Sequence, residues 1–380
     1  MSRIALFAMS LFDHFFAARD RWLSNARFRR FAAAFPLTRP LARHHARALF
    51  DVCAGFVYSQ TLLACVRLRL FEHLSQHGPQ SPAELASRFA LSEEAMLRLL
   101  RAAASLKLVQ ARSGGRYGLG RLGAAMIDNQ GIMAMVEHHA LLYHDLRDPL
   151  ALLRGEQEQT GLGQYWPYAT TDQPSSLQAE KIAAYTELMA ASQPMVAQEV
   201  LNVYSFKRHR CLLDVGGGDG TFLRAVAAQA PQLRLMLFDL PAVAQQAKAR
   251  FNDAGLAERV QVFGGSALSD TLPQGADIIS LVRVIHDHED EVALAFLRAA
   301  RAALPDDGVL LLAEPMAGTS GAEPISDAYF GFYLLAMGTG RARTPTELQA
   351  LLIAAGFERF RILATHTPLL TRVMLAHPAR

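Results

Sequence analysis

LLDVGGGDGTFLRAVAAQA, residues 212–230, joins a short apolar run to a helical pattern through a glycine-rich loop. Glycines at such a junction let a ligand approach the backbone closely. A dinucleotide loop of the form GxGxxG would need glycine at position 221 or 223, and these positions hold Thr221 and Leu223. The pattern present is acid-x-Gly-x-Gly-x-Gly, formed by Asp214, Gly216, Gly218 and Gly220.

Two acids end successive apolar runs beside this loop. Asp214 stands where a carboxylate is badly placed for a pyrophosphate and well placed for a cationic amino group. Asp239 ends the next run, LMLFDLP, where a carboxylate can accept from both hydroxyls of a ribose. A ligand with a ribose, an ammonium group and no phosphate is S-adenosylmethionine, which we expect as the cofactor. The alternative is that the glycines only make a tight turn.

After about Cys211 short apolar runs alternate with helical segments, as CLLDVGGG, LRLMLFDLP, RVQVFGGS, ADIISLVRVIH, GVLLLAEPM, FRILATH and TRVMLAH. This alternation predicts an α/β fold with a Rossmann-like, mostly parallel sheet of seven strands and helices on both faces. Only TPLL separates the last two runs, which is too short for a crossover helix. We therefore expect a terminal antiparallel hairpin.

The segment before the sheet predicts a winged helix. A helix is expected from about Phe56 to Leu74, Ser81 and Ser92 cap two further helices, and QARSGGRYGLG predicts a hairpin. Basic residues on the third helix leave DNA binding open as an alternative: Arg98, Arg101 and Lys107. Glu93 and Glu94 occupy the end of that helix from which bases are usually contacted, so a protein-interaction module is favoured.

The composition limits the class of protein. About half of the 380 residues are hydrophobic, enough for the cores of two domains. The three cysteines, Cys53, Cys65 and Cys211, include no CxxC pair, which indicates a reduced compartment and no structural zinc. The longest apolar stretch, Val52–Val66, is too short to span a bilayer, so we expect a cytoplasmic protein.

The first fifty residues are strongly basic. They hold nine arginines against Asp13 and Asp20, a net charge of +7, and the rest of the chain carries −4. In RDRWLSNARFRRFAAAF the arginines alternate with Trp and Phe, a pattern that suits an anionic membrane surface or an acidic partner. The other interpretation is a solvated helix that packs its aromatic residues on its own domain or on a dimer mate.

RVIHDHEDE, residues 283–291, ends an apolar run at His286. A metal site would need both imidazoles on one ion, but His286 at a strand end and His288 in the turn should point differently. The acids suit the N-cap and first turn of the next helix. His286 is then either a satisfied core residue or a general base at the carboxyl edge of the sheet, where open α/β sheets bind ligands. With an ordinary pKa of ~6.5 it would be neutral in the cell.

These motifs, with FDLP, FGGSAL, AALPDDGVLLLAEP and TPTELQALLIAAGF, resemble the class I S-adenosylmethionine-dependent O-methyltransferases of the caffeic-acid type. The resemblance covers nearly everything after about residue 50. It implies a Rossmann-like methyltransferase sheet, an N-terminal all-helical, winged-helix dimerisation domain, and a homodimer without nucleic acid. Within the family, the leader FPLTRPLARHHARALFDVCAGFVYSQ is most similar to the bacterial carotenoid branch. Those enzymes methylate the tertiary 1-hydroxyl of acyclic carotenoids such as demethylspheroidene and hydroxyneurosporene.

The expected domains follow from the motifs and the resemblance. They are basic amphipathic helices at 1–50, a winged-helix-like dimerisation domain at 51–121, a helical connector at 122–206 and the S-adenosylmethionine-binding methyltransferase domain at 207–380. The resemblance makes His286 the general base and Glu314 the acid that orients it. We expect Asp287 as a further catalytic residue beside His286, and no metal. The expected cofactor-binding residues are Asp214, Gly216, Gly218, Asp239, Leu240, Ser266, Ala267 and Arg283.

Two departures from the family pattern bear on this site. The acid that usually binds the adenine amino group is replaced by Ser266, and the methionine that stacks on adenine by Ala267, so adenine must be recognised differently. A second base-orienting glutamate falls on Ala342, so His286 must rely on Glu314 and Asp287.

ISDAYFGFYLLAMGTG, residues 325–340, is apolar nearly all round and predicts a helix buried at a pocket or a dimer interface. The expected substrate-pocket residues are Tyr185, Met189, Tyr329, Tyr333 and Met337. An apolar tunnel suits a long polyene, and the basic leader would hold the enzyme at the inner membrane. The alternatives are a phenolic, polyketide or bacteriochlorophyllide acceptor, or a non-catalytic winged-helix regulator that senses S-adenosylmethionine.

Overall fold

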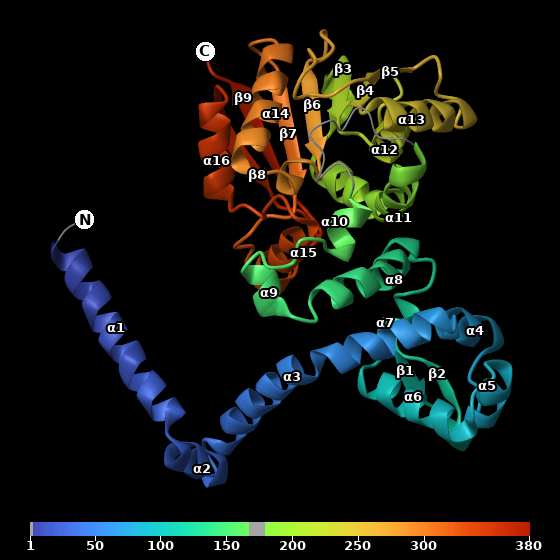
Figure 1. Cartoon of the computed structure of the whole chain (residues 1–380), viewed down its shortest axis with the longest axis vertical. Helices are drawn as coiled ribbons and strands as arrows, with labels where there is room; N and C mark the ends of the chain where they lie inside the picture. Colours follow the sequence, from blue (N-terminus) through green and yellow to red (C-terminus); the bar gives the residue numbers. More distant parts are fainter. Residues whose placement is uncertain (1–2, 167–178) are drawn as a thin grey trace. The chain divides into compact units, whose positions relative to one another are not determined.

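The computed structural model describes residues 3–166 and 179–380, with side chains described at 12–166 and 190–380. The chain forms two compact units, Met1–Ile127 and Asp128–Arg380. Figure 1 shows that the first unit is mainly helical and that the second carries the large sheet. The finer division into four segments stays a prediction.

The first unit begins with three helices, α1 (Arg3–Ser24), α2 (Ala26–Ala34) and α3 (Arg39–Arg67). FPLTRP, residues 35–40, has the composition of a turn, and the chain turns there, since residues 35–38 lie between α2 and α3. The single helix expected from Phe56 to Leu74 is wrong, since the chain breaks at Arg69, whose φ is 52°, and continues as α4 (Leu70–His77). The change of direction at this break points Leu70, Phe71 and Leu74 toward the core, where all three are buried.

A winged helix completes this unit. Its elements are α5 (Pro82–Arg88), α6 (Glu93–Ser105), β1 (Val109–Ala111), the short turn η1 (Ser113–Gly115), β2 (Tyr117–Leu119) and α7 (Arg121–Ala124). Ser81 and Glu84 form a capping box, and the side chain of Ser92 accepts from the backbone N–H of Ala95. The predicted caps and hairpin are confirmed, because β1 and β2 pair antiparallel from Val109 with Leu119.

Among the described residues, α3 has the length and apolar composition of a membrane span, with a mean hydropathy of 1.6 over an 18-residue window. The stretch Val52–Val66 considered from the sequence is shorter than the helix that contains it. Only 22% of the window is buried within this chain. Core helices of soluble proteins reach the same length and composition, so this is weak evidence for a span.

The second unit opens with helices α8 (Gln130–Asp145), α9 (Pro149–Leu153), α10 (Gly161–Tyr165) and α11 (Ala179–Val203), followed by the turn η3 (Phe206–Arg208). The stretch GLGQYWPYATTDQPSS, residues 161–176, has the composition of a loop, but its first five residues form α10, and the part from residue 167 lies outside the described residues. Asp145 explains the helix, because its carboxylate accepts from the N–H groups of Gly161 (2.7 Å) and Leu162 (2.9 Å) at its start.

Seven strands form the sheet, in the order β5-β4-β3-β6-β7-β9-β8. They are β3 (Cys211–Val215), β4 (Arg234–Asp239), β5 (Val260–Gly264), β6 (Ile278–Val282), β7 (Val309–Glu314), β8 (Phe357–Leu363) and β9 (Arg372–Pro378). All neighbours run parallel except β9, which is antiparallel to β7 and to β8. The predicted seven-strand α/β sheet with a terminal antiparallel hairpin is confirmed.

Helices cover both faces of the sheet (Figure 1). The helices α14 (Asp290–Ala303) and α16 (Pro345–Ala354) bury their apolar residues in one core layer. The other layer contains α11, α12 (Thr221–Gln229) and α13 (Pro241–Asp253). The loops at the carboxyl ends of β3, β4, β6 and β7 therefore meet at one edge, where parallel sheets bind ligands.

Candidate active site

The glycine loop begins where β3 ends. Gly216, Gly218 and Gly220 all have positive φ, of 69°, 58° and 80°, which side chains rarely adopt. A Cβ on Gly216 would lie 2.7 Å from Cγ2 of Val284, so this loop passes directly against the segment after β6. A Cβ on Gly218 would meet no atom within 4 Å, so Gly218 borders open space. The tight turn and the room for a ligand therefore occur in the same loop.

Asp239 ends β4 and reaches across to the glycine loop. Its Oδ2 accepts from the N–H of Gly218 and its Oδ1 from the N–H of Leu240, both at 2.7 Å. Burial raises the pKa of Asp239 to about 6, although these two N–H groups act to lower it. The structure thus brings together Gly218, Asp239 and Leu240 as the sequence predicted, and each carboxylate oxygen keeps a second lone pair for a hydroxyl.

Asp214 lies under this loop with 1% of its surface exposed. The hydroxyl of Ser280 donates to its Oδ1 at 2.6 Å, whereas its Oδ2 has no hydrogen-bond partner among the described residues. Burial raises the pKa of Asp214 to about 7. An orphaned, buried carboxylate oxygen is a group that an ammonium would satisfy, so the residues fit the amino acid end of S-adenosylmethionine.

Ser266 and Ala267 follow β5, near the end of β4. The backbone N–H of Gly265 donates to the carbonyl of Asp239 at 2.9 Å, which joins the two strand ends. The N–H of Ser266 donates at 2.7 Å to Oδ2 of Asp270. Asp270 therefore places a carboxylate beside Ser266, one turn beyond the position where the family pattern has an acid. No sequence motif indicated Asp270 as a residue of the site.

The strand β6 ends at Val282, so the expectation that His286 closes a strand is wrong. His286 instead lies in a single helical turn, η4 (Ile285–Asp287). The strand stops because Arg283 has a φ of 59°, a left-handed conformation that costs a residue with a side chain about 1 kcal/mol. The guanidinium of Arg283 donates to the hydroxyl of Ser192 on α11 at 2.8 Å.

Glu314 ends β7 and holds this turn. Its Oε1 accepts from the N–H groups of Val284 (3.0 Å) and Ile285 (2.8 Å), and its Oε2 contacts Nδ1 of His286 at 2.6 Å. The carboxylate, which is 1% exposed, therefore places the imidazole proton on Nδ1. The other ring nitrogen, Nε2, lies 3.1 Å from Oδ1 of Asp287. The three predicted catalytic residues are thus in contact.

The carboxylates around the turn change the pKa of the His286 imidazole. Burial acts to lower the pKa of His286, but the carboxylates of Asp287 and Glu314 raise it more, so the pKa of the imidazole lies above its ordinary value. Burial raises the pKa of Asp287 to about 6, against the lowering effect of the imidazole. The ordinary histidine pKa assumed from the sequence therefore does not hold for His286.

His288 takes no part in this cluster. Its ring stacks on Phe296 with the ring centroids 4.9 Å apart, and burial lowers its pKa to about 4. No group of three His, Cys, Asp or Glu side chains that could hold a metal ion occurs within 12–166 and 190–380.

The apolar segment 325–340 forms a π-helical turn, η5 (Pro324–Tyr329), and α15 (Phe330–Met337). The ring of Phe330 meets His286 edge-on at 6.0 Å, and Tyr329 packs against Phe330 and Tyr333. Met337 is fully buried. These side chains form an aromatic wall beside the turn. Tyr185 and Met189 lie outside the residues whose side chains the structure describes.

Two histidines of α8 brace this wall. Nε2 of His138 lies 2.7 Å from the hydroxyl of Tyr333, which also accepts from the indole N–H of Trp166 at 3.3 Å. Because indole only donates, the Tyr333 hydroxyl is left to donate to His138. Burial lowers the pKa of His138 to about 4, so it is a neutral acceptor. His139 similarly meets Tyr329 at 2.9 Å. No local sequence pattern indicates these pairs, because their partners are 195 and 190 residues away.

The site combines a glycine loop with a carboxylate-held imidazole at the carboxyl edge of a mostly parallel sheet, and this sheet defines an α/β protein of the Rossmann-like class. The O-methyltransferase domain of one family matches residues 143–358, and its dimerisation domain matches residues 50–129. The chain belongs to this O-methyltransferase family. It is therefore an S-adenosylmethionine-dependent enzyme, which leaves the regulator interpretation without support, and its dimerisation domain indicates a homodimer.

Two relatives are similar over most of the chain. A demethylspheroidene O-methyltransferase of Cereibacter sphaeroides is 42% identical over 356 residues, which is 94% of this chain and 93% of that protein. The protein of the same name from Rhodobacter capsulatus is 42% identical over 343 residues, 90% of this chain and 84% of that protein. Among solved structures, the methyltransferase CalO1 in its SAH-bound form is 27% identical with a TM-score of 0.73, covering 88% of this chain and 98% of that one.

We predict that Asp214→Asn stabilises the protein without cofactor at about pH 8 by about 1–3 kcal/mol. The folded pKa of Asp214 is raised to about 7, so its contribution to stability is present at low pH and is lost as the pH rises toward 7. The substitution removes this loss and should give no gain at about pH 4, and it should weaken S-adenosylmethionine binding. Urea unfolding at both pH values, with calorimetry of cofactor binding, measures this.

Asp277→Asn is the matched control, because three contacts to backbone N–H groups of Arg210 and Cys211 help to lower the pKa of that carboxyl. It should destabilise the protein at about pH 8. A loss of stability at that pH for Asp214→Asn would contradict the argument.

Proposed function

We propose that this enzyme methylates the tertiary 1-hydroxyl of an acyclic carotenoid such as demethylspheroidene or hydroxyneurosporene. The observation that carries the substrate class is the 42% identity, over 94% of the chain, to a protein named demethylspheroidene O-methyltransferase. The aromatic wall of Tyr329, Phe330 and Tyr333 beside His286 supports an extended apolar acceptor. A long polyene would be desolvated along such a wall, and only its hydroxyl would need a polar partner.

S-adenosylmethionine supplies an electrophilic methyl group to this reaction. In the proposal His286 takes the proton of the acceptor hydroxyl at Nε2, while Glu314 keeps Nδ1 protonated and fixes the ring. An aliphatic alcohol is about as weak an acid as water, ~15.7, so His286 cannot ionise it beforehand. Proton removal therefore accompanies formation of the new carbon–oxygen bond, and most of the rate comes from alignment and exclusion of water.

Asp287 lies where the acceptor hydroxyl must approach. Oδ1 of Asp287 lies 3.1 Å from Nε2 of His286. In the proposal the acceptor hydroxyl has to take the place of this carboxylate to reach Nε2. We assign to Asp287 the role of keeping the imidazole strongly basic, because its charge raises the pKa of His286. The base form is then available only above the ordinary pKa of ~6.5, and the acidic limb of the pH profile of kcat/KM, which reports the free enzyme, should lie above that value.

The proposed cofactor contacts are the carboxylates of Asp214 and Asp239, the backbone of Gly216, the open side of Gly218, and Arg283 near the methyl-transfer position. Leu240, Ser266 and Ala267 would border the nucleoside. The support is their common position at the carboxyl edge of the sheet, and the unpartnered Oδ2 of Asp214.

Turnover of purified enzyme with labelled S-adenosylmethionine tests the substrate class. We expect methyl transfer to demethylspheroidene or hydroxyneurosporene and none to phenolic, polyketide or bacteriochlorophyllide acceptors. Transfer only to one of those three would replace the carotenoid by that acceptor.

His286→Ala should lower kcat by about a hundredfold or more and leave the Kd for S-adenosylmethionine within about twofold. His288→Ala is the control, because that ring stacks on Phe296 instead of facing Glu314. Steady-state kinetics and calorimetry measure both quantities. Retained activity in His286→Ala would refute its role as base.

We also propose that residues 12–50 place the enzyme on the inner membrane as a peripheral protein. Large apolar side chains are exposed on α1 to α3 and in the link between α2 and α3: Phe12, Phe15, Phe16, Trp22, Leu23, Phe31, Phe35, Leu37, Leu41, Leu49 and Phe50. No residue of α2 is buried. Arginines lie between them in sequence, so this segment matches an anionic lipid surface in both charge and apolar character. The dimerisation match starts at residue 50, so most of these side chains precede it.

Flotation with liposomes tests this placement. The full chain should float with vesicles of phosphatidylglycerol and phosphatidylcholine, a version lacking residues 1–48 should stay behind, and added salt should release the full chain. In the full-length charge variant, Arg21, Arg27 and Arg30 are changed to Gln, which should weaken flotation while leaving the aromatic residues intact. Equal flotation of all three proteins would refute the proposal.

A further inference from the structure

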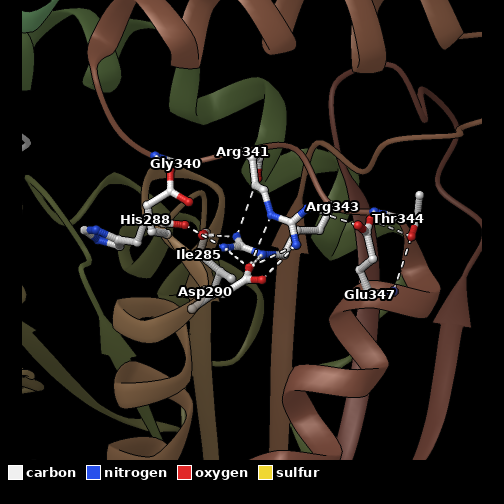
Figure 2. A network of polar contacts seen from close by, with 9 residues as sticks. Ile285, His288, Asp290, Gly340, Arg341, Arg343, Thr344 and Glu347 are labelled. Carbon is white, nitrogen blue, oxygen red and sulfur yellow. Dashed lines mark hydrogen bonds and ion pairs between the residues drawn. The ribbon is translucent and has the colours of Figure 1, made fainter. Parts of the chain in front are cut away.

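The loop that follows α15 lies directly against the catalytic turn (Figure 2). Gly340 has a φ of 83°, and a Cβ there would collide with backbone atoms of His286 and Asp287. Its N–H donates to the side chain of Glu289 at 3.2 Å. Only glycine allows the loop to approach the peptide between these two residues so closely.

Three residues further on, Arg343 enters the protein interior. It is 2% exposed and is one of the largest fully buried side chains among the described residues. Its Nη1 donates to the carbonyl of Ile285 at 2.8 Å, its Nη2 to the carbonyl of His288 at 2.7 Å, and its Nε to Asp290 at 2.8 Å. Figure 2 shows the guanidinium between these acceptors.

The two carbonyls flank His286 and Asp287 on either side. The internal hydrogen bond of the turn, from the N–H of His288 to the carbonyl of Ile285, is 3.4 Å long. The bond from Arg343 to the same carbonyl is 2.8 Å long and charge-assisted, so it is the stronger of the two. The hydrogen bond from Arg343 therefore holds the carbonyl of Ile285 more strongly than the hydrogen bond within the turn does.

Two side chains of opposite charge hold the catalytic turn, the carboxylate of Glu314 and the guanidinium of Arg343. Glu314 binds the N–H groups of Val284 and Ile285 from one side, whereas Arg343 binds the carbonyls of Ile285 and His288 from the other. A buried guanidinium is costly unless its donors are satisfied, and Asp290 supplies the opposite charge. The position before Arg343, where the family pattern places a base-orienting glutamate, holds Ala342.

We infer that Arg343 is a positioning residue for methyl transfer, which holds the backbone on both sides of the His286–Asp287 pair so that the imidazole meets the acceptor hydroxyl. This inference rests on the proposed role of His286 as base. Arg343 does not touch that imidazole, and it acts only through the carbonyls of Ile285 and His288.

Steady-state kinetics of Arg343→Lys and Arg343→Met test this positioning role. They are measured with the acceptor that the wild-type enzyme methylates. Lysine keeps the charge but cannot span two carbonyls with a planar fork. We expect both variants to lower kcat per cofactor-binding site by about tenfold or more, since small displacements of a catalytic group are costly. The Kd for S-adenosylmethionine should stay within about twofold, and the acidic limb of the pH profile should shift.

Arg341→Gln is the matched control. Arg341 also binds Asp290, at 2.8 Å, but it is partly exposed and contacts no carbonyl of the turn. It should keep wild-type kcat and the wild-type pH profile. Counting sites by calorimetry separates the two roles, because a merely structural Arg343 would reduce the number of binding sites and leave kcat per site and the pH profile unchanged.

Gly340→Ala provides a second route if the Arg343 variants do not fold. Its Cβ would push on the same peptide, so kcat should fall while cofactor binding persists. Unchanged kcat per site in the variant that folds would overturn the inference. Retained activity in His286→Ala would instead remove the proposed base, and turnover of another acceptor would leave the inference about Arg343 standing.

Discussion

The catalytic turn depends on one buried carboxylate, that of Glu314. Its two oxygens have three N–H contacts, two from the backbone of Val284 and Ile285 and one from His286. Those backbone donors lie just beyond the end of β6, so the carboxylate that holds the segment after the strand also aims the imidazole. Because the carboxylate fixes the proton on Nδ1, it leaves Nε2, which faces Asp287 at 3.1 Å, as the ring position that can take a proton. Loss of Glu314 would leave several buried donors unpaired at once.

Three other acids of the site lower the stability of the folded protein when they are charged. Asp214, Asp239 and Asp287 all have pKa values raised by burial, which means that the folded protein disfavours their charged forms. In a core without function such groups would be replaced by apolar residues. Here the cost is repaid when positive groups and hydroxyls enter the site, so cofactor binding and folding stability are coupled.

Local signals in the sequence predicted much of the fold. The caps at Ser81 and Ser92, the glycine loop and the short TPLL link act over a few residues, and the structure agrees with them. The left-handed break at Arg69 had no such signal, because it serves the burial of Leu70 and Phe71. At the site, motifs indicated the contact of His286 with Glu314. They could not indicate Arg343 or the His138–Tyr333 pair, whose partners lie 53 to 195 residues away.

The strand β9 has a consequence for the edge on which the catalytic acid lies. It covers Arg372–Pro378 and pairs along β7 with Arg372 opposite Glu314. On its other side β9 pairs with β8, so β9 alone joins the antiparallel hairpin to the parallel part of the sheet. If β9 came loose, the whole hairpin would leave and β7 would become an open strand edge with Glu314 at its end. An open edge pairs readily with other chains, so the strand that shields the catalytic acid also protects the enzyme from aggregation.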